Sequence, residues 1–251
     1  MSKKIISLAP NITDIIRKLG YSDYIVAHTN HSDIKNSEKI GNWLSPDFNR
    51  IKEINPDIIF TSDPLQEKIY EKLNKQFNVH HTEPSRLNHL FPLITDISTK
   101  IGDAGEAEKL NRNLQNRINR VRLIQEENSP VVYCEEWDTP PMVAGNWVPE
   151  MVRIAGGKYP FVEPGNRSRK ISEEEFYEEN TDVFISHICG RNLQQNPNNS
   201  REKWDYSGSI YFINDDYINN LSTRTVDGIE AISEIIYDVD LNKSSLYNHY
   251  K

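Results

Sequence analysis

The chain has 251 residues, 37% of them hydrophobic and 26% charged, which is long enough for one large or two small globular domains with buried cores. Its formal net charge of −8 argues against a nucleic-acid partner, because phosphate binding needs a basic face. No apolar run reaches the roughly 18 residues of a membrane span, and two cysteines are too few for a disulfide framework.

Short apolar strands and amphipathic helices alternate from the beginning of the chain. Strands are expected at 4–9, 24–27 and 57–61 and from Val79 onward, and helices at 11–19, 48–54 and 67–77. This alternation is typical of a parallel sheet covered by helices on both faces. We therefore predict an N-terminal α/β lobe over residues 1–98.

The pattern changes between residues 103 and 127. Apolar residues recur at helical spacing among polar ones, at Ala107, Leu110, Leu114, Ile118, Val121 and Ile124. About 24 helical residues make a rod of roughly 36 Å, and a stripe this narrow suits a helix that bridges two lobes. One more peripheral helix of a single domain is the alternative.

Alternation resumes in the last half of the chain. Strands are expected at 130–134, 182–186 and 210–213, and helices at 148–155, 173–178 and 224–237. We predict a C-terminal α/β lobe over residues 129–251. The predicted fold class is α/β, with two Rossmann-like lobes whose parallel sheets are joined by one long helix.

The beginning of the chain indicates its compartment. Met1 to Lys4 is basic, but only residues 5–9 are apolar before Pro10, whereas a secretory leader needs about 7 to 15 apolar residues. The sequence as written is therefore expected to be cytoplasmic, and periplasmic or otherwise extracytoplasmic if it is a trimmed form.

Seven short motifs spread over the chain resemble one family. They are IISLAPNITDI at 5–15, GNW at 41–43, FNRI at 48–51, NPDII at 55–59, DTPPMVAG at 138–145, AGG at 155–157 and DGIE at 227–230. The ordered set resembles the cobalamin-binding branch of the ABC-importer periplasmic binding proteins, whose lobes are joined by a single long helix. Within that branch, the resemblance is to a variant that carries no leader.

The resemblance implies a protein that holds a bulky small molecule between its lobes without chemical turnover. The ligand expected first is cobalamin or a related corrinoid, with no resident cofactor. A ferric siderophore, haem or a metal ion is the alternative ligand. No membrane insertion is expected.

The same resemblance implies which residues touch the ligand. In the first lobe they are Pro10, Asn11, His31, where a cobalamin binder often has tyrosine, and Trp43, which matches an aromatic packed on the corrin. In the second lobe they are Trp137, Met142, Asn146 and Trp147. Aromatic faces suit a flat macrocycle, although core packing is the alternative for each tryptophan.

Two positions depart from the family pattern. Importer-docking members carry one glutamate on each lobe to meet permease arginines; Glu174 matches the second, but Asn49 stands in place of the first. This substitution argues against a permease partner. Ser62 replaces another aromatic and leaves the ligand open.

An enzyme is the competing class. Glu135, Glu136 and His187 could serve a tetrapyrrole metal-chelatase-like reaction, and His31, His80 and His187 lie near strand ends as metal ligands would. The sequence contains no nucleophile elbow, phosphate-cradling glycine loop or zinc-protease motif. We therefore expect no catalytic and no metal residues, and we expect Cys134 and Cys189 to be free thiols.

Overall fold

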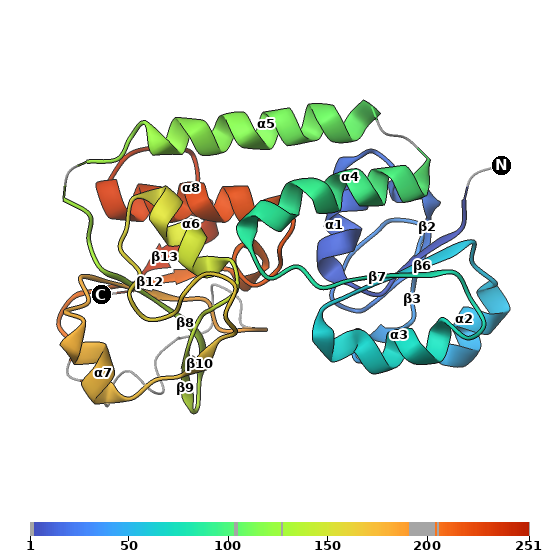
Figure 1. The fold of residues 1–251 in the computed structure, drawn as a ribbon, viewed down its shortest axis with the longest axis horizontal. Coiled ribbons are helices and arrows are strands. Elements are labelled where there is room, and N and C mark those ends of the chain that lie inside the picture. Colours follow the sequence, from blue (N-terminus) through green and yellow to red (C-terminus); the bar gives the residue numbers. More distant parts are fainter. Residues whose placement is uncertain (1–2, 103–104, 127, 191–203, 205, 251) are drawn as a thin grey trace. The chain divides into compact units, whose positions relative to one another are not determined.

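The computed structural model describes residues 3–102, 105–126, 128–190, 204 and 206–250. Contacts between Cα atoms divide the chain into two compact units. Unit 1 is Met1–Pro84 with His89–Arg112, and unit 2 is Ser85–Asn88 with Asn113–Lys251. Each unit has its own sheet and helices (Figure 1), which confirms the predicted α/β fold class.

The sheet of unit 1 has the strand order β3-β2-β1-β6-β7, and its neighbouring strands are parallel. The strands are β1 (Ile5–Ser7), β2 (Ile25–His28), β3 (Glu38–Lys39), β6 (Ile58–Ser62) and β7 (Val79–Thr82). The register aligns Ser7 of β1 with Phe60 of β6. Because parallel strands end at the same edge, the loops that follow β1, β6 and β7 share one side of the sheet.

The helices of unit 1 include one that the sequence analysis did not predict. The helices are α1 (Pro10–Lys18), α2 (Phe48–Ile54), α3 (Glu67–Leu73) and α4 (Leu90–Ile101). In α1, Pro10 occupies the first turn, where no backbone N–H partner is needed, and Ile12, Ile15 and Ile16 are buried. The unpredicted helix is α4, which buries its own apolar stripe, Leu90, Leu93, Ile94, Ile97 and Ile101.

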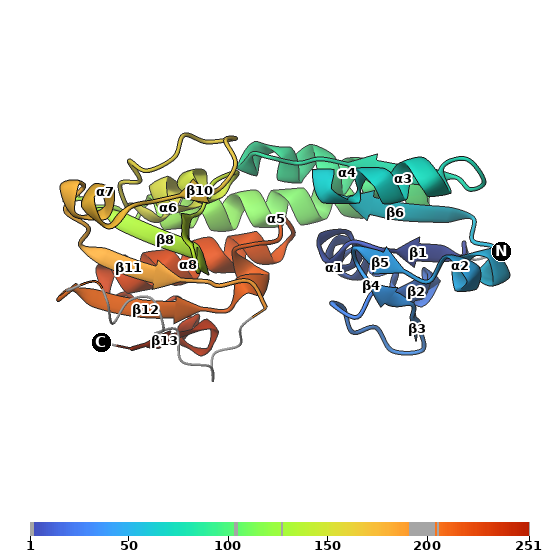
Figure 2. The ribbon, with the colours of Figure 1, turned by 90° about the horizontal axis from the view of Figure 1, so that it is seen from below.

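The sheet of unit 2 has the strand order β10-β9-β8-β11-β12-β13. The strands are β8 (Val132–Asp138), β9 (Pro141–Val143), β10 (Arg169–Lys170), β11 (Val183–Ser186), β12 (Ser209–Ile213) and β13 (Tyr247–His249). The central pairs β8–β11 and β11–β12 are parallel, as expected, and Figure 2 shows β11 beside β12. Strands β9, β10 and β13, which were not predicted, pair antiparallel with their neighbours.

Local signals set the helices of unit 2. They are α6 (Val148–Ala155), α7 (Glu173–Glu178) and α8 (Arg224–Tyr237), at the predicted bounds. Ser172 caps α7 by accepting a hydrogen bond from the Glu175 amide, and Gly156 ends α6 with φ +101°. Helices α6 and α8 pack against each other.

The long helix α5 (Gly105–Arg122) carries the boundary between the units. Residues 103, 104 and 127 of the expected linker helix lie outside the described residues. The predicted stripe is buried at Ala107, Leu114, Ile118 and Val121. In unit 1, Asn111 Nδ2 donates a hydrogen bond to the Phe91 carbonyl at 3.1 Å.

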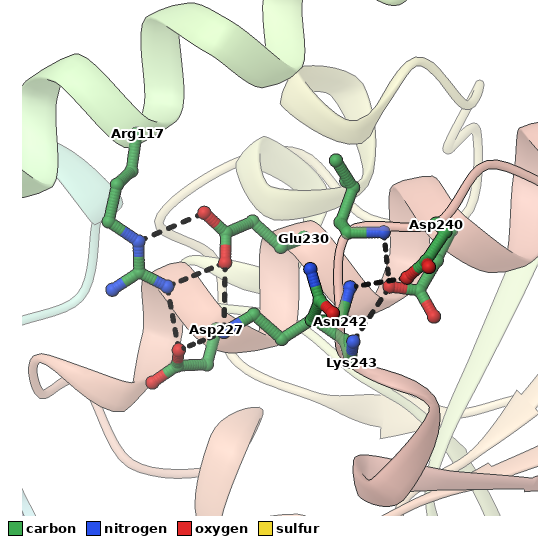
Figure 3. Close-up of polar contacts among 8 residues, drawn as sticks. Arg117, Asp227, Glu230, Asp240, Asn242 and Lys243 are labelled. Atoms are coloured by element: carbon green, nitrogen blue, oxygen red, sulfur yellow. Dashed lines mark hydrogen bonds and ion pairs between the residues drawn. The ribbon is translucent and has the colours of Figure 1, made fainter.

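In unit 2, Arg117 of α5 contacts two carboxylates of α8 (Figure 3). Its Nη2 lies 2.6 Å from both Asp227 Oδ1 and Glu230 Oε2, and Lys243 Nζ lies 2.7 and 3.1 Å from the same two oxygens. Burial alone would raise the pKa of Asp227, but the hydrogen bond from Lys243 and the charge of Arg117 outweigh it and lower that pKa. We call these four residues the ion cluster.

No helix within the described ranges combines the length and the apolar character needed to cross a bilayer.

Candidate ligand-binding site

The carboxyl edge of the unit 1 sheet carries a cluster of short polar side chains. Ligands of open α/β sheets usually bind at this edge. Asn11, at the start of α1, is only 7% exposed, and its Nδ2 donates a hydrogen bond to Ser62 Oγ at 3.0 Å. Thr82 Oγ1 donates to the same oxygen at 3.2 Å. These contacts tie α1 to the ends of β6 and β7.

Gln66 is the central residue of this edge. It is fully buried at the end of the 3-10 turn η2 (Pro64–Gln66). Its Oε1 accepts a hydrogen bond from the Ser62 amide at 2.8 Å, and its Nε2 donates to the Leu8 carbonyl at 2.9 Å and to the Trp43 carbonyl at 2.6 Å. One amide thus joins the segments at the ends of β1 and β6 to residues 41–46, which we call the Trp43 turn.

Trp43 lies in the tight turn between β4 (Gly41–Asn42) and β5 (Ser45–Pro46) and is half-buried. Gly41 has φ +101°, and a Cβ atom there would lie 2.7 Å from the Ser45 carbonyl oxygen, so only glycine fits. The Asn30 amide donates to the Gly41 carbonyl at 2.9 Å, which fastens the loop after β2 to this turn.

The structure therefore brings the ligand-contact residues predicted for the first lobe to neighbouring loops of one edge. His31 is exposed directly after Asn30, and Pro10 is half-buried beside Asn11. Two large aliphatic side chains that the sequence analysis did not single out are also exposed there: Leu44 by 47% and Leu65 by 64%.

In unit 2, two predicted residues form a cross-strand pair. Trp137 of β8 lies opposite Met142 of the antiparallel strand β9. Trp137 is 44% exposed and Met142 is half-buried. The Trp137 indole Nε1 donates a hydrogen bond to the Thr139 carbonyl at 3.0 Å, so the ring has a fixed edge.

Asn146 and Trp147 lie in a different environment. Asn146 has φ +53°, and its backbone carbonyl accepts a hydrogen bond from the Gly165 amide at 2.9 Å. Trp147 is only 8% exposed, and its indole Nε1 donates to the Ile218 carbonyl at 2.7 Å. Its ring is part of the core of unit 2.

His187 follows β11 and is completely buried. Its Nδ1 lies 2.6 Å from Asn219 Oδ1, and Asn219 Nδ2 donates to the His187 carbonyl at 3.1 Å. Burial lowers the pKa of His187 to about 4, although the contact with Asn219 opposes this shift. The imidazole is therefore neutral at pH 7, with the proton on Nδ1 facing the Asn219 oxygen.

The two carboxylates considered for chelatase-like chemistry have hydrogen-bond partners of their own. The Tyr133 hydroxyl donates to Glu135 Oε1 at 3.4 Å, and Ser168 Oγ donates to Glu136 Oε2. Within the described residues, no cluster of three or more His, Cys, Asp or Glu side chains could hold a metal ion. Cys134 and Cys189 are free, and burial raises the pKa of both thiols.

The two positions tied to transporter docking are both exposed. Glu174 lies in the first turn of α7, and Asn49 lies in the first turn of α2. The carboxylate nearest in sequence to Asn49 is Asp47, which caps α2 by accepting hydrogen bonds from the amides of Asn49 and Arg50.

Sequence reasoning missed Gln66 and Asn219, the two amides that organise these loops. Gln66 bonds residues that are 58 and 23 positions away, and Asn219 bonds a histidine 32 positions away. A lone amide in a turn gives no pattern from which such contacts could be predicted. Only the turn residues Asp63 and Pro64 mark the place of Gln66.

Comparison with known proteins gives concordant results. The family model described as periplasmic binding protein matches residues 5–208. A vitamin B12-binding protein of Vibrio cholerae serotype O1 is 21% identical over 244 residues, and the match covers 92% of this chain and 88% of that protein.

Two solved structures are similar in fold. The periplasmic vitamin B12 binding protein of Vibrio cholerae has a TM-score of 0.72 at 19% identity, covering 94% of this chain and 97% of the other. A periplasmic heme binding protein from Pseudomonas aeruginosa has a TM-score of 0.80 at 16% identity, covering 100% and 99%.

Proposed function

Because the chain belongs to the periplasmic binding protein family, we propose that it binds a corrinoid such as cobalamin and does not convert it. The observation that carries this proposal is the carboxyl edge of the unit 1 sheet, where polar contacts fasten a half-exposed tryptophan beside loops that follow parallel strands. The vitamin B12-binding relatives support the corrinoid as the first ligand to test.

The side chains at this edge suit a wide, flat, largely apolar ligand. The Trp43 ring offers an aromatic face, and the exposed Leu44 and Leu65 extend the apolar surface on the joined loops. His31, exposed on the next loop, is a polar group that can orient the ligand.

In unit 2 we propose Trp137 and Met142 as contact residues, because the pair is partly exposed and the indole is fixed by its bond to Thr139. Trp147 is left out of this surface, since its ring is buried and its N–H is used within the core. A site that both lobes share stays a prediction from the sequence, as does the compartment.

Binding without turnover agrees with the chemistry of the described residues. His187 is a buried, neutral imidazole held by Asn219, and both thiols are protonated at neutral pH. The strand-end loops therefore present groups that bind and orient a ligand.

We also propose that the protein docks only weakly to a permease, because one of the two surface glutamates that docking would use is missing. The first turn of α2 presents Asn49, while the Asp47 carboxylate is committed to capping the helix. Glu174 of α7 remains the one exposed carboxylate that matches the docking pattern.

The test is a spectral titration of the purified protein with cyanocobalamin and, in parallel, with hemin. We expect a stoichiometric change in the cyanocobalamin spectrum, and we expect Trp43→Ala to weaken binding by more than about tenfold, as for a central aromatic anchor. Trp43→Phe is the matched variant and should retain most of the affinity.

Three outcomes are informative. Saturable binding of hemin with no response to cyanocobalamin would replace the corrinoid by a porphyrin. An unchanged affinity in Trp43→Ala would remove the unit 1 edge from the site, and a slow change in the spectrum of the ligand with time would indicate turnover.

A further inference from the structure

The Trp43 turn is held by a residue that does not itself reach the surface. Gln66 is fully buried, and its amide makes three hydrogen bonds of 2.6 to 2.9 Å to three different segments. The shortest of the three ends on the Trp43 carbonyl.

The three bonds need a side chain that carries both a hydrogen-bond acceptor and a hydrogen-bond donor, which few residue types supply. One oxygen accepts from the Ser62 amide, while one nitrogen donates to the Leu8 and Trp43 carbonyls. A glutamate carboxylate has no donor for the two carbonyls, and an aliphatic side chain has neither donor nor acceptor. Without Gln66, these buried backbone groups lose their partners, which is costly.

Gln66 also lies next in sequence to a side chain of the proposed ligand-contact surface. Leu65, its neighbour in η2, is 64% exposed, and Leu44, the neighbour of Trp43, is 47% exposed. The bond between Gln66 and Trp43 therefore sets how the Trp43 turn lies against η2.

We infer that Gln66 is a positioning residue for ligand binding, which raises affinity by holding the Trp43 turn in its binding geometry. This inference rests on the proposed function, because it acts through Trp43. Preorganising a contact residue in this way improves affinity by lowering the entropy lost on binding.

The experiment is a double-mutant cycle on the full chain, with cyanocobalamin as the probe. It compares wild type, Gln66→Met, Trp43→Ala and the double variant. We expect Gln66→Met alone to weaken binding about tenfold, Trp43→Ala to weaken it more than about tenfold, and Gln66→Met to add less than about twofold once Trp43 is absent. Residues that act through one another show this non-additivity.

Gln76→Met is the matched control, since Gln76 is an exposed glutamine of the same unit, just after α3. It should leave affinity unchanged. A second readout is the 19F resonance of Trp43 in protein labelled with 5-fluorotryptophan, which we expect to broaden or shift in Gln66→Met before ligand is added.

Equal losses from Gln66→Met with and without Trp43 would overturn the inference, because a general structural role predicts additivity. Full affinity in Gln66→Met would overturn it too, while leaving the proposed function in place. If Trp43→Ala itself binds normally, the proposed role of the unit 1 edge fails and the inference fails with it. Should Gln66→Met not fold, Gln66→Asn, whose shorter amide cannot reach all three partners, takes its place in the same cycle.

Discussion

The tripeptide Gly-Asn-Trp occurs in both units, and the indole rings of its two copies lie in different environments. In Gly41-Asn42-Trp43 the indole is half-buried in a hairpin turn, and the residue is held through its backbone carbonyl. In Gly145-Asn146-Trp147 the indole is buried and held through its own N–H. Both glycines are needed, because a Cβ atom would lie 2.7 Å and 2.3 Å from a backbone oxygen.

In both units the local sequence sets the tight turn, whereas the segment packed opposite the turn determines the environment of the tryptophan. Opposite Trp147 lies the Ile218 carbonyl, which accepts the indole hydrogen bond. Opposite the Trp43 turn lies the side chain of Gln66, which donates its hydrogen bond to the Trp43 backbone carbonyl. Trp147 is a core residue, whereas Trp43 is the tryptophan that we propose as a ligand contact.

Trp147→Ala should give the largest effect on stability. Truncating a buried tryptophan typically costs about 3 to 5 kcal/mol, because apolar contact is lost and a cavity remains. We expect a loss of that size in the free energy of unfolding, measured with urea, and near-normal cyanocobalamin affinity while the protein stays folded.

Trp147→Phe is the control for the hydrogen bond. It keeps most of the ring but leaves the Ile218 carbonyl unpaired, so about 1 to 3 kcal/mol should be lost. A Trp147→Ala variant of unchanged stability that binds poorly would contradict the structural role of Trp147, since it would make both tryptophans ligand contacts.

His187 should make the free energy of unfolding depend on pH. It contacts Asn219, the residue next to the Ile218 carbonyl that accepts the Trp147 hydrogen bond. The pKa of His187 falls from its ordinary value to about 4 in the folded protein, so the unfolded chain binds more protons between about pH 6.5 and 4. The neutral His187 imidazole therefore adds up to about 3 kcal/mol to the free energy of unfolding. This stabilisation is complete above pH 6.5 and is lost as pH falls toward 4.

His187→Gln should flatten this part of the stability profile, measured by urea unfolding at pH 7.5, 6 and 5. The comparison of the two proteins separates His187 from His28, whose pKa burial also lowers. An identical slope in both proteins would contradict the assignment.

Trp43→Ala should give the smallest effect on stability. The ring is half-buried and the Gln66 bond goes to the backbone, so the free energy of unfolding should fall by about 1 kcal/mol or less. The same urea measurement applies. A loss as large as that of Trp147→Ala would show that Trp43 is also a core residue.

The helices that carry strong local signals could be predicted from the sequence. For α6, α7 and α8 the bounds agree to the residue, because each has a cap, a glycine stop or a clear apolar stripe. The short strands β3, β4, β5, β9, β10 and β13 were missed, since a two- or three-residue strand is defined by its partner and not by its own composition.

The candidate site was predictable at the level of loops. The resemblance of the motifs gave Asn11, His31 and Trp43, which the structure places on neighbouring loops. It did not separate Trp43 from Trp147, because the hydrogen-bond partner of the Trp147 indole, the Ile218 carbonyl, is 71 positions away in the sequence.

The ion cluster places two cations, Arg117 and Lys243, beside the two carboxylates that α8 carries. Arg117 and Lys243 each contact both Asp227 and Glu230, so every anion has two cations within reach. Loss of either cation leaves both anions neutralised in part by the survivor. Only the joint loss of Arg117 and Lys243 leaves two like charges side by side on one helix, so either cation should be replaceable alone at less cost to stability than both together.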